Sequence, residues 1–70
     1  MMKELLANVA GNVRRIRTQK GMTQLQLAHK TKLALSTIAD IEQRRRDNLS
    51  LKTLVSISKA LKINPTKLLK

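Results

Sequence analysis

The stretch from Lys20 to Glu42, KGMTQLQLAHKTKLALSTIADIE, decides the fold of this chain. Thr23 can N-cap a helix, because Gln26 stands three residues later, where a capping box requires Glu or Gln. Gly21 suits the end of the preceding helix, since glycine adopts the left-handed backbone at little cost. The start of this stretch therefore predicts a helix end followed closely by a helix start.

A second short helix is expected over residues 35–43, after a turn that Leu33 fills. Ile38 and Ile41 lie three residues apart, so they share the buried face of this helix. Ala28 stands where the two helices cross, and its small side chain lets them approach closely. A polar residue at either isoleucine position would lie unpaired in the core. The stretch thus predicts two helices packed tightly against each other.

The rest of the chain also has helical periodicity, with apolar residues three or four positions apart and no strand-like alternation. We expect five helices, over residues 3–19, 23–30, 35–43, 50–61 and 65–69. The apolar face of the fourth helix is expected to contain Leu51, Leu54, Ile57 and Leu61. Residues 1–70 are therefore predicted to form a single all-α domain, a compact five-helix bundle.

Charge limits the classes of partner. Fifteen Lys and Arg residues against four Asp and Glu give a formal net charge of +11. Such an excess favours a polyanionic partner, with nucleic acid ahead of an anionic membrane. The chain also has no Phe, Tyr or Trp. Because proteins that bind single strands or RNA usually stack bases on aromatic rings, this absence favours double-stranded DNA.

The sequence offers little for catalysis or metal binding. His29 is the only histidine, and no acid, Ser or Cys stands at a recognised catalytic spacing from it, so we expect it to be an exposed helix residue. The four acids do not form a metal-ligand set, and there is no cysteine. No apolar run is long enough to cross a membrane. We therefore expect no enzymatic activity, no cofactor or metal, no small-molecule substrate and no membrane partner.

Two short helices joined by about four residues are the components of a helix-turn-helix motif. The chain resembles the lambda-repressor and Cro-like helix-turn-helix family from about Asn12 to Leu69. The segments that carry the resemblance are residues 13–17, 20–24, 27–28, 36–38, 41–42, 50–54 and 60–61. The most specific signal is GMTQ followed, after two residues, by LA. The resemblance implies a compact five-helix domain and sequence-specific binding of double-stranded DNA. It also implies a homodimer on a two-fold symmetric operator, acting in transcriptional regulation in the cytoplasm at the nucleoid.

By this resemblance, four residues of the second motif helix, the recognition helix, face base edges in the major groove. They are Leu35, Ser36, Ala39 and Asp40. Ser36 can bond several base edges, and Asp40 can accept a hydrogen bond from a cytosine amino group. Leu35 and Ala39 can contact a thymine methyl group. Because this surface has no Arg or Asn fork, we expect modest direct readout supplemented by DNA shape.

Phosphate contacts are expected around this helix, from Gln24, Thr37, Gln43, Arg44, Arg45 and Arg46. Gln24 opens the first motif helix, where backbone N–H groups and the helix dipole favour a phosphate, and the family's Gln contacts the DNA backbone there. The three consecutive arginines follow the recognition helix directly. Arg14, Arg15 and Lys20 are expected to add a long-range field without direct contact.

The resemblance also implies a structural ion pair between Arg17, near the end of the first helix, and Glu42, near the end of the recognition helix. Breaking one side of such a pair, if it is partly buried, costs about 3–5 kcal/mol.

Several positions depart from the family: Asp40 stands where Arg, Lys or Gln is frequent, Gly is common near Arg44 and Pro near Leu49, and two further departures lie in the motif itself. Lys32 stands where the motif turn usually has Gly, and Ala34 stands where Ser or Thr caps the recognition helix. Each of these two departures in the motif is expected to cost about 1 kcal/mol.

A dimer surface is expected on the final helix and the segment before it, at Ile63, Leu68 and Leu69. The alternative is that Ile63 and Leu68 simply close the core. Because no sequence follows Lys70, we expect regulation by the protein's own concentration, regulation by a partner, or no regulation at all.

Two other classes of function remain open. One is an antitoxin-type protein-interaction module of a toxin–antitoxin pair that keeps the DNA-binding fold; the missing toxin-binding tail argues mildly against it. The other is a basic amphipathic protein that acts on membranes or RNA. The GMTQ turn and the small Ala28 argue against this class, because membrane-binding helices need no such hairpin.

Overall fold

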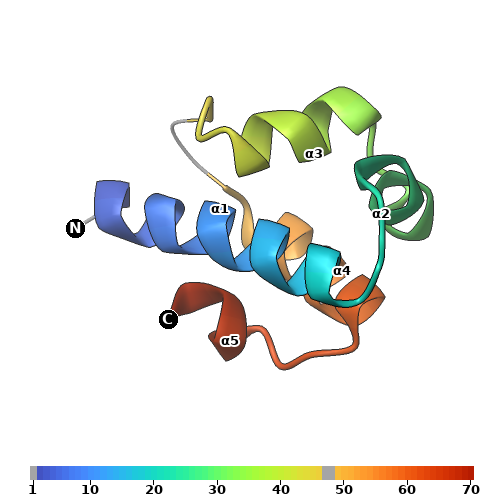
Figure 1. Cartoon of the computed structure of the whole chain (residues 1–70). Helices are drawn as coiled ribbons and strands as arrows, with labels where there is room; N and C mark the ends of the chain where they lie inside the picture. Colours follow the sequence, from blue (N-terminus) through green and yellow to red (C-terminus); the bar gives the residue numbers. More distant parts are fainter. Residues whose placement is uncertain (1, 47–48) are drawn as a thin grey trace.

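The computed structural model of the chain describes residues 2–46 and 49–70. Within these ranges it contains five α-helices and no strand (Figure 1). The helices are α1 (Met2–Gln19), α2 (Gln24–Thr31), α3 (Leu35–Glu42), α4 (Leu51–Leu61) and α5 (Thr66–Leu69). The predicted all-α class is confirmed, and each helix boundary lies within a residue or two of its expected place.

The long helix α1 organises the bundle, because α3, α4 and α5 all contact it. Figure 1 shows α3 on one side of α1 and α5 on the opposite side. The short helix α2 packs against α3 and α4 and lies beyond the end of α1. Helix α3 is therefore held by α1 and α2 on its inner side, while α5 lies on the other side of the molecule.

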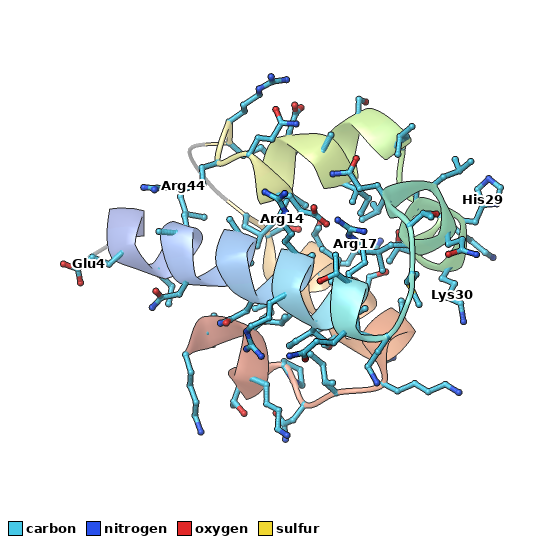
Figure 2. The ribbon with its side chains drawn as sticks, viewed as in Figure 1. Glu4, Arg14, Arg17, His29, Lys30 and Arg44 are labelled. Atoms are coloured by element: carbon cyan, nitrogen blue, oxygen red, sulfur yellow. The ribbon has the colours of Figure 1, made fainter. Side chains whose placement is uncertain are left out.

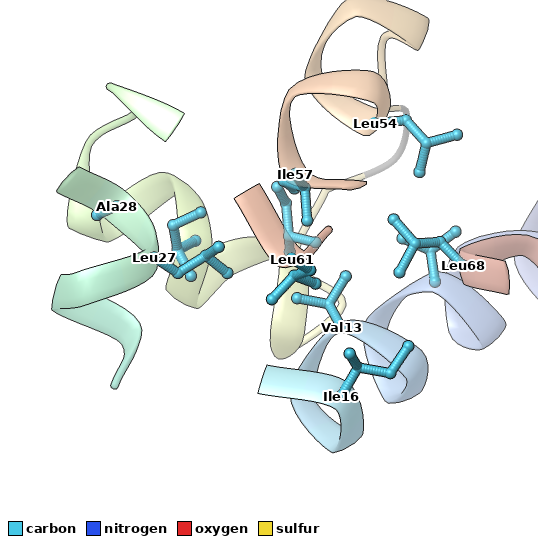
Figure 3. Packing of buried hydrophobic residues seen from close by; sticks show 11 residues of the cluster. Val13, Ile16, Leu27, Ala28, Leu54, Ile57, Leu61 and Leu68 are labelled. Carbon is cyan, nitrogen blue, oxygen red and sulfur yellow. The ribbon is translucent and has the colours of Figure 1, made fainter. Parts of the chain in front are cut away.

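All five helices contribute to an aliphatic core (Figure 3). Six side chains in it have no exposed surface: Val13, Leu27, Ile38, Ile57, Leu61 and Leu68. Burial of each large side chain contributes about 1.5–3 kcal/mol before the entropy of ordering is subtracted. Ala28 is 3% exposed at the crossing of α2 and α3, and Leu33 in the turn packs against the same cluster, as the sequence predicts.

The prediction for Leu51 is wrong. This residue opens α4 and is 73% exposed, whereas Leu54, one turn later, is 7% exposed. The helix reaches the core only after its first turn, so the buried face begins at Leu54. Apolar periodicity correctly predicts the face of α4 but not where along the helix the neighbouring elements begin.

Four helices end in the same way, with a residue in the left-handed backbone conformation. These residues are Gly21, Lys32, Arg44 and Lys62, whose φ values are 68°, 60°, 60° and 58°. After each one, the next N–H donates to a carbonyl five residues back, as from Leu33 to Ala28 at 3.2 Å and from Arg45 to Asp40 at 2.9 Å. This is the Schellman motif, which satisfies carbonyls at the helix end. Only Gly21 adopts this conformation without strain.

The helix starts follow the sequence closely. The capping box at α2 is formed: the Thr23 hydroxyl accepts from the Gln26 N–H at 3.0 Å, and the Gln26 carboxamide accepts from the Thr23 N–H at 2.8 Å. Ser50 caps α4 through the Thr53 N–H at 3.1 Å. Ala34 precedes α3 without a side-chain cap, as expected. The helix that presents the predicted recognition surface therefore starts without this source of stability.

We predict that Lys32→Gly raises the melting temperature, whereas Lys59→Gly lowers it. Both changes remove an exposed cation near a helix C-terminus, so they lose a similar interaction with the helix dipole. Glycine at position 32 relieves about 1 kcal/mol of left-handed strain, whereas glycine within α4 costs about 0.5–1 kcal/mol. Thermal melts followed by circular dichroism resolve such differences, since about 1 kcal/mol shifts the melting temperature of a small domain by about 4–8 °C. Equal shifts for the two variants would show that Lys32 is not strained.

Candidate nucleic-acid interface

Helix α3 has one buried and one exposed side. Ile38 and Ile41 are 0% and 5% exposed and face the core. Each residue turns the helix by about 100°, so Ser36, Asp40 and Gln43 lie opposite them. Of these, Ser36 and Gln43 are exposed and Asp40 is partly buried. The outward side of α3 is therefore polar.

The two other predicted base-facing residues flank this side. Leu35 is 45% exposed at the start of α3. Ala39 is partly buried one turn later. The structure thus brings the four predicted base-facing residues together on the accessible part of α3. Their contacts with bases stay a prediction.

Arg17 and Glu42 form a bidentate ion pair. The Arg17 Nε donates to Glu42 Oε2 at 2.7 Å, and Arg17 Nη2 donates to Glu42 Oε1 at 2.9 Å. The two side chains are only 10% and 2% exposed. Figure 2 shows Arg17 directed from α1 toward α2 and α3. The structure therefore contains the pair that the resemblance implied, and it joins the end of α3 to α1.

Two further hydrogen bonds extend this pair into a network. Glu42 Oε1 also accepts from Gln24 Nε2 at 3.1 Å, and Arg17 Nη1 donates to the Met22 carbonyl at 2.7 Å. The end of α1, the start of α2 and the end of α3 are thus joined through one carboxylate and one guanidinium. The sequence analysis missed both contacts, because nothing in the spacing relates Gln24 to Glu42. This network fixes α2 and α3 relative to each other.

The hydrogen bond from Gln24 to Glu42 leaves the Gln24 amide able to make its predicted phosphate contact. A carboxamide nitrogen carries two donors, and Glu42 accepts from one of them. The second donor lies at the first residue of α2, where backbone N–H groups also point out of the helix. The contact stays a prediction, but the geometry holds the side chain at the place where a phosphate would bind.

The arginines after α3 turn back over its polar side. Arg45 Nη1 lies 3.7 Å from Asp40 Oδ1, and Arg46 Nη2 donates to Thr37 Oγ1 at 3.3 Å. Both contacts are exposed and contribute about 0–1 kcal/mol to stability. Their importance is positional, since they place guanidinium groups beside the outward side of α3. The sequence predicted only that these arginines follow the recognition helix, because the reversal depends on the left-handed conformation of Arg44.

The predicted dimer surface needs a correction at Leu68. This side chain has no exposed surface and is part of the core cluster, so it cannot contact a second protein. α5 packs against α1, and Asn12 Nδ2 donates to the Leu68 carbonyl at 2.9 Å. The alternative that Leu68 closes the core is therefore correct. Ile63 and Leu69 are partly buried against the same cluster, and their role in dimerisation stays a prediction.

The described residues can also be compared with what catalysis, metal binding or membrane insertion would require. His29 is exposed and projects from α2 into solvent (Figure 2), as expected. Over residues 2–46 and 49–70, no cluster of three or more His, Cys, Asp or Glu could hold a metal ion. Asp47 lies outside the described residues. No described helix is both long and apolar enough to cross a membrane.

The arrangement of α2 and α3 agrees with the comparison of the sequence with known families. The profile of the Cro/C1-type helix-turn-helix family matches residues 13–68. This match covers most of the chain and includes both motif helices, the turn between them and Arg17. The protein therefore belongs to the Cro/C1-type helix-turn-helix family.

Individual relatives include repressors and controllers. The immunity repressor protein of Bacillus phage phi105 is 46% identical over 55 residues, which make up 79% of this chain and 38% of the repressor. The chain thus matches little more than a third of that relative. The restriction-modification controller protein C.AhdI from Aeromonas hydrophila has a TM-score of 0.85 at 33% identity, covering 90% of this chain and 94% of the controller. The structure of the controller C.Esp1396I bound to a 25 base pair operator site has a TM-score of 0.79 at 42% identity. The match covers 86% of this chain and 78% of that controller.

We predict that Glu42→Ala destabilises the protein more than replacement of any other acid by alanine. It leaves the buried guanidinium of Arg17 without its partner, which costs about 3–5 kcal/mol. By comparison, Glu4 lies exposed in the first turn of α1, and Asp40 has one exposed contact. Urea unfolding of the four single variants, at Glu4, Asp40, Glu42 and Asp47, measures the ranking. An unfolding free energy for the Glu42 variant close to that of the Glu4 variant would refute a structural role for the pair.

Proposed function

We propose that this protein is a transcriptional regulator that binds double-stranded DNA sequence-specifically, with α3 in the major groove. The observation that carries the proposal is the polar side of α3, held outward by the Arg17–Glu42–Gln24 network and flanked by arginines. Membership of the Cro/C1-type family and the net charge of +11 support it. In the cell, such a regulator would act in the cytoplasm at the nucleoid.

The dimensions of α3 suit this role. An α-helix with its side chains is about 10–12 Å across, and the major groove of B-DNA is about 12 Å wide, so α3 can lie in the groove. Leu35 and Ser36 lie at its N-terminal end, the end that meets base edges in helix-turn-helix proteins. Ser36 can then bond a base edge, and Leu35 can contact a thymine methyl group. Arg45 beside Asp40 offsets the negative charge that the recognition helix would otherwise carry toward DNA.

Phosphate contacts surround this surface in the proposal. Gln24 and the N–H groups at the start of α2 would bind one phosphate, and Thr37, Gln43 and the run Arg44 to Arg46 would bind others. Gln24 and the arginines lie toward opposite ends of α3, because α2 is at the start of this helix and the arginine run leaves its end (Figure 1). Such a frame positions the helix in the groove without itself reading sequence.

The same geometry favours a homodimer on a two-fold symmetric operator. Half-sites of helix-turn-helix dimers lie one DNA turn apart, about 34 Å from centre to centre. The domain measures 30 × 22 × 19 Å and presents one α3 helix, so it reads one half-site. Two copies related by a two-fold axis would place their recognition helices in successive major grooves on one face of the duplex.

We predict that selection from a random duplex library enriches a two-fold symmetric motif. The dependence of the logarithm of the binding constant on that of salt concentration should have a slope between about −5 and −9, as several phosphate contacts require. Sequencing of the bound fraction at several salt concentrations measures both quantities. Salt-sensitive binding without an enriched motif would contradict sequence-specific regulation and favour a protein-interaction module.

Two single substitutions should separate base reading from phosphate binding. Ser36→Ala should flatten base preference at one position of each half-site and leave the salt slope unchanged. Arg46→Gln should keep the motif and reduce the magnitude of the slope by about one for each protomer. Lys59→Gln on α4 is the matched control, because it removes the same charge outside the proposed interface. An Arg46 variant that behaves like the Lys59 control would exclude Arg46 from the phosphate contacts.

A further inference from the structure

A second basic surface lies away from α3. A groove of about 520 Å³ runs between the second half of α1 and the segment that includes α5. Figure 1 shows α5 on the side of α1 opposite α3, so this groove is separate from the proposed DNA interface. The inference below goes beyond DNA binding and does not depend on it.

Four cations line this groove: Arg15, Lys20, Lys67 and Lys70. Two come from the end of α1 and the turn after it, and two come from the C-terminal segment, so the fold brings together charges that are far apart in the sequence. None of the described lining residues is Asp or Glu. Glu42 pairs with Arg17 and Asp40 with Arg45, on the other side of α1. The groove therefore has a concentrated positive potential.

Arg15 is held in place at this groove. Asn12 Oδ1 accepts from Arg15 Nη2 at 3.1 Å, while Asn12 Nδ2 donates to the Leu68 carbonyl at 2.9 Å. Asn12 thus connects the guanidinium to the α5 wall of the groove. A guanidinium carries five N–H donors, so Arg15 can still donate to a phosphate while Asn12 orients it.

Two of the residues that line the groove are apolar, and the others are polar or charged. Ile16 is 8% exposed and Ile63 is partly buried. The volume of the groove lies within the usual range of small-molecule sites, about 300–1,000 Å³. A second copy of the chain packed groove to groove would bring the same four cations against these four, so this charge disfavours a dimer contact at Ile63, which lines the groove, and leaves Leu69 as the other candidate.

From these features we infer that the groove binds a nucleotide-sized polyphosphate. Three or four phosphate charges balance the four cations, and Ile63 offers an apolar contact for a base beside them. The sequence analysis gave Arg15 and Lys20 only a long-range role, because nothing in the sequence shows that Lys67 and Lys70 join them.

Calorimetric titration of the full chain with ATP and with inorganic tripolyphosphate, at about 150 mM NaCl, tests the inference. The variant Arg15→Gln/Lys67→Gln removes two groove charges, and Lys52→Gln/Lys59→Gln on α4 removes two charges elsewhere. We expect the dissociation constant of both ligands to rise about tenfold or more in the groove variant, since two charge-assisted contacts are lost. In the control variant the dissociation constant should change less than about twofold, because that variant alters only the long-range electrostatic field.

The outcomes separate this inference from simpler explanations. Equal weakening in the two double variants would mean that the anions respond to net charge alone, and no binding by the unmodified chain would also overturn the inference. If a random-sequence duplex competes with tripolyphosphate and the groove variant loses about two units of the DNA salt slope, the groove holds DNA backbone instead. Should the Arg15 variant fail to fold, Lys67→Gln/Lys70→Gln repeats the test at two exposed positions near the chain end.

Discussion

The guanidinium of Arg17 and the carboxylate of Glu42 are both largely withdrawn from water, and neither charge is tolerated there without the other. Their two parallel hydrogen bonds fix orientation as well as distance, which a single lysine contact would not do. Because Glu42 also holds Gln24, the carboxylate determines how the start of α2 and the end of α3 lie relative to α1. The outward side of α3 is presented correctly only while this small set of polar contacts is intact.

Local signals in the sequence were sufficient for much of this architecture. The box formed by Thr23 and Gln26, and the buried pair Ile38 and Ile41, depend on neighbours three residues away, so spacing alone predicts them. The Arg17–Glu42 pair is different, since 25 residues separate its members. Only the resemblance to a family supplied it. The base-facing positions on α3 came from the same source, and the structure shows that they are accessible.

What could not be predicted depends on how elements meet in space. Leu51 and Leu68 both follow apolar periodicity. Leu51 is exposed because α4 reaches the core only after its first turn, whereas Leu68 is buried where α5 packs against α1. Likewise, Arg45 and Arg46 belong to a charged run, and the sequence of this run does not predict where their side chains point. The left-handed backbone of Arg44 turns them back onto α3, and that conformation is set by the helix end, where glycine is the usual residue.

Three of the four left-handed helix ends carry a lysine or arginine. Each keeps a strained backbone and adds a positive charge to the surface, so the fold has less conformational stability than glycine would allow. In a domain whose net stability is about 5–15 kcal/mol, that loss is substantial. A polyanion at about a hundred times its dissociation constant would restore about 2.7 kcal/mol. The unbound molecules are then the ones that unfold and meet cellular proteases, so the lifetime of the protein would follow the occupancy of its anion-binding sites.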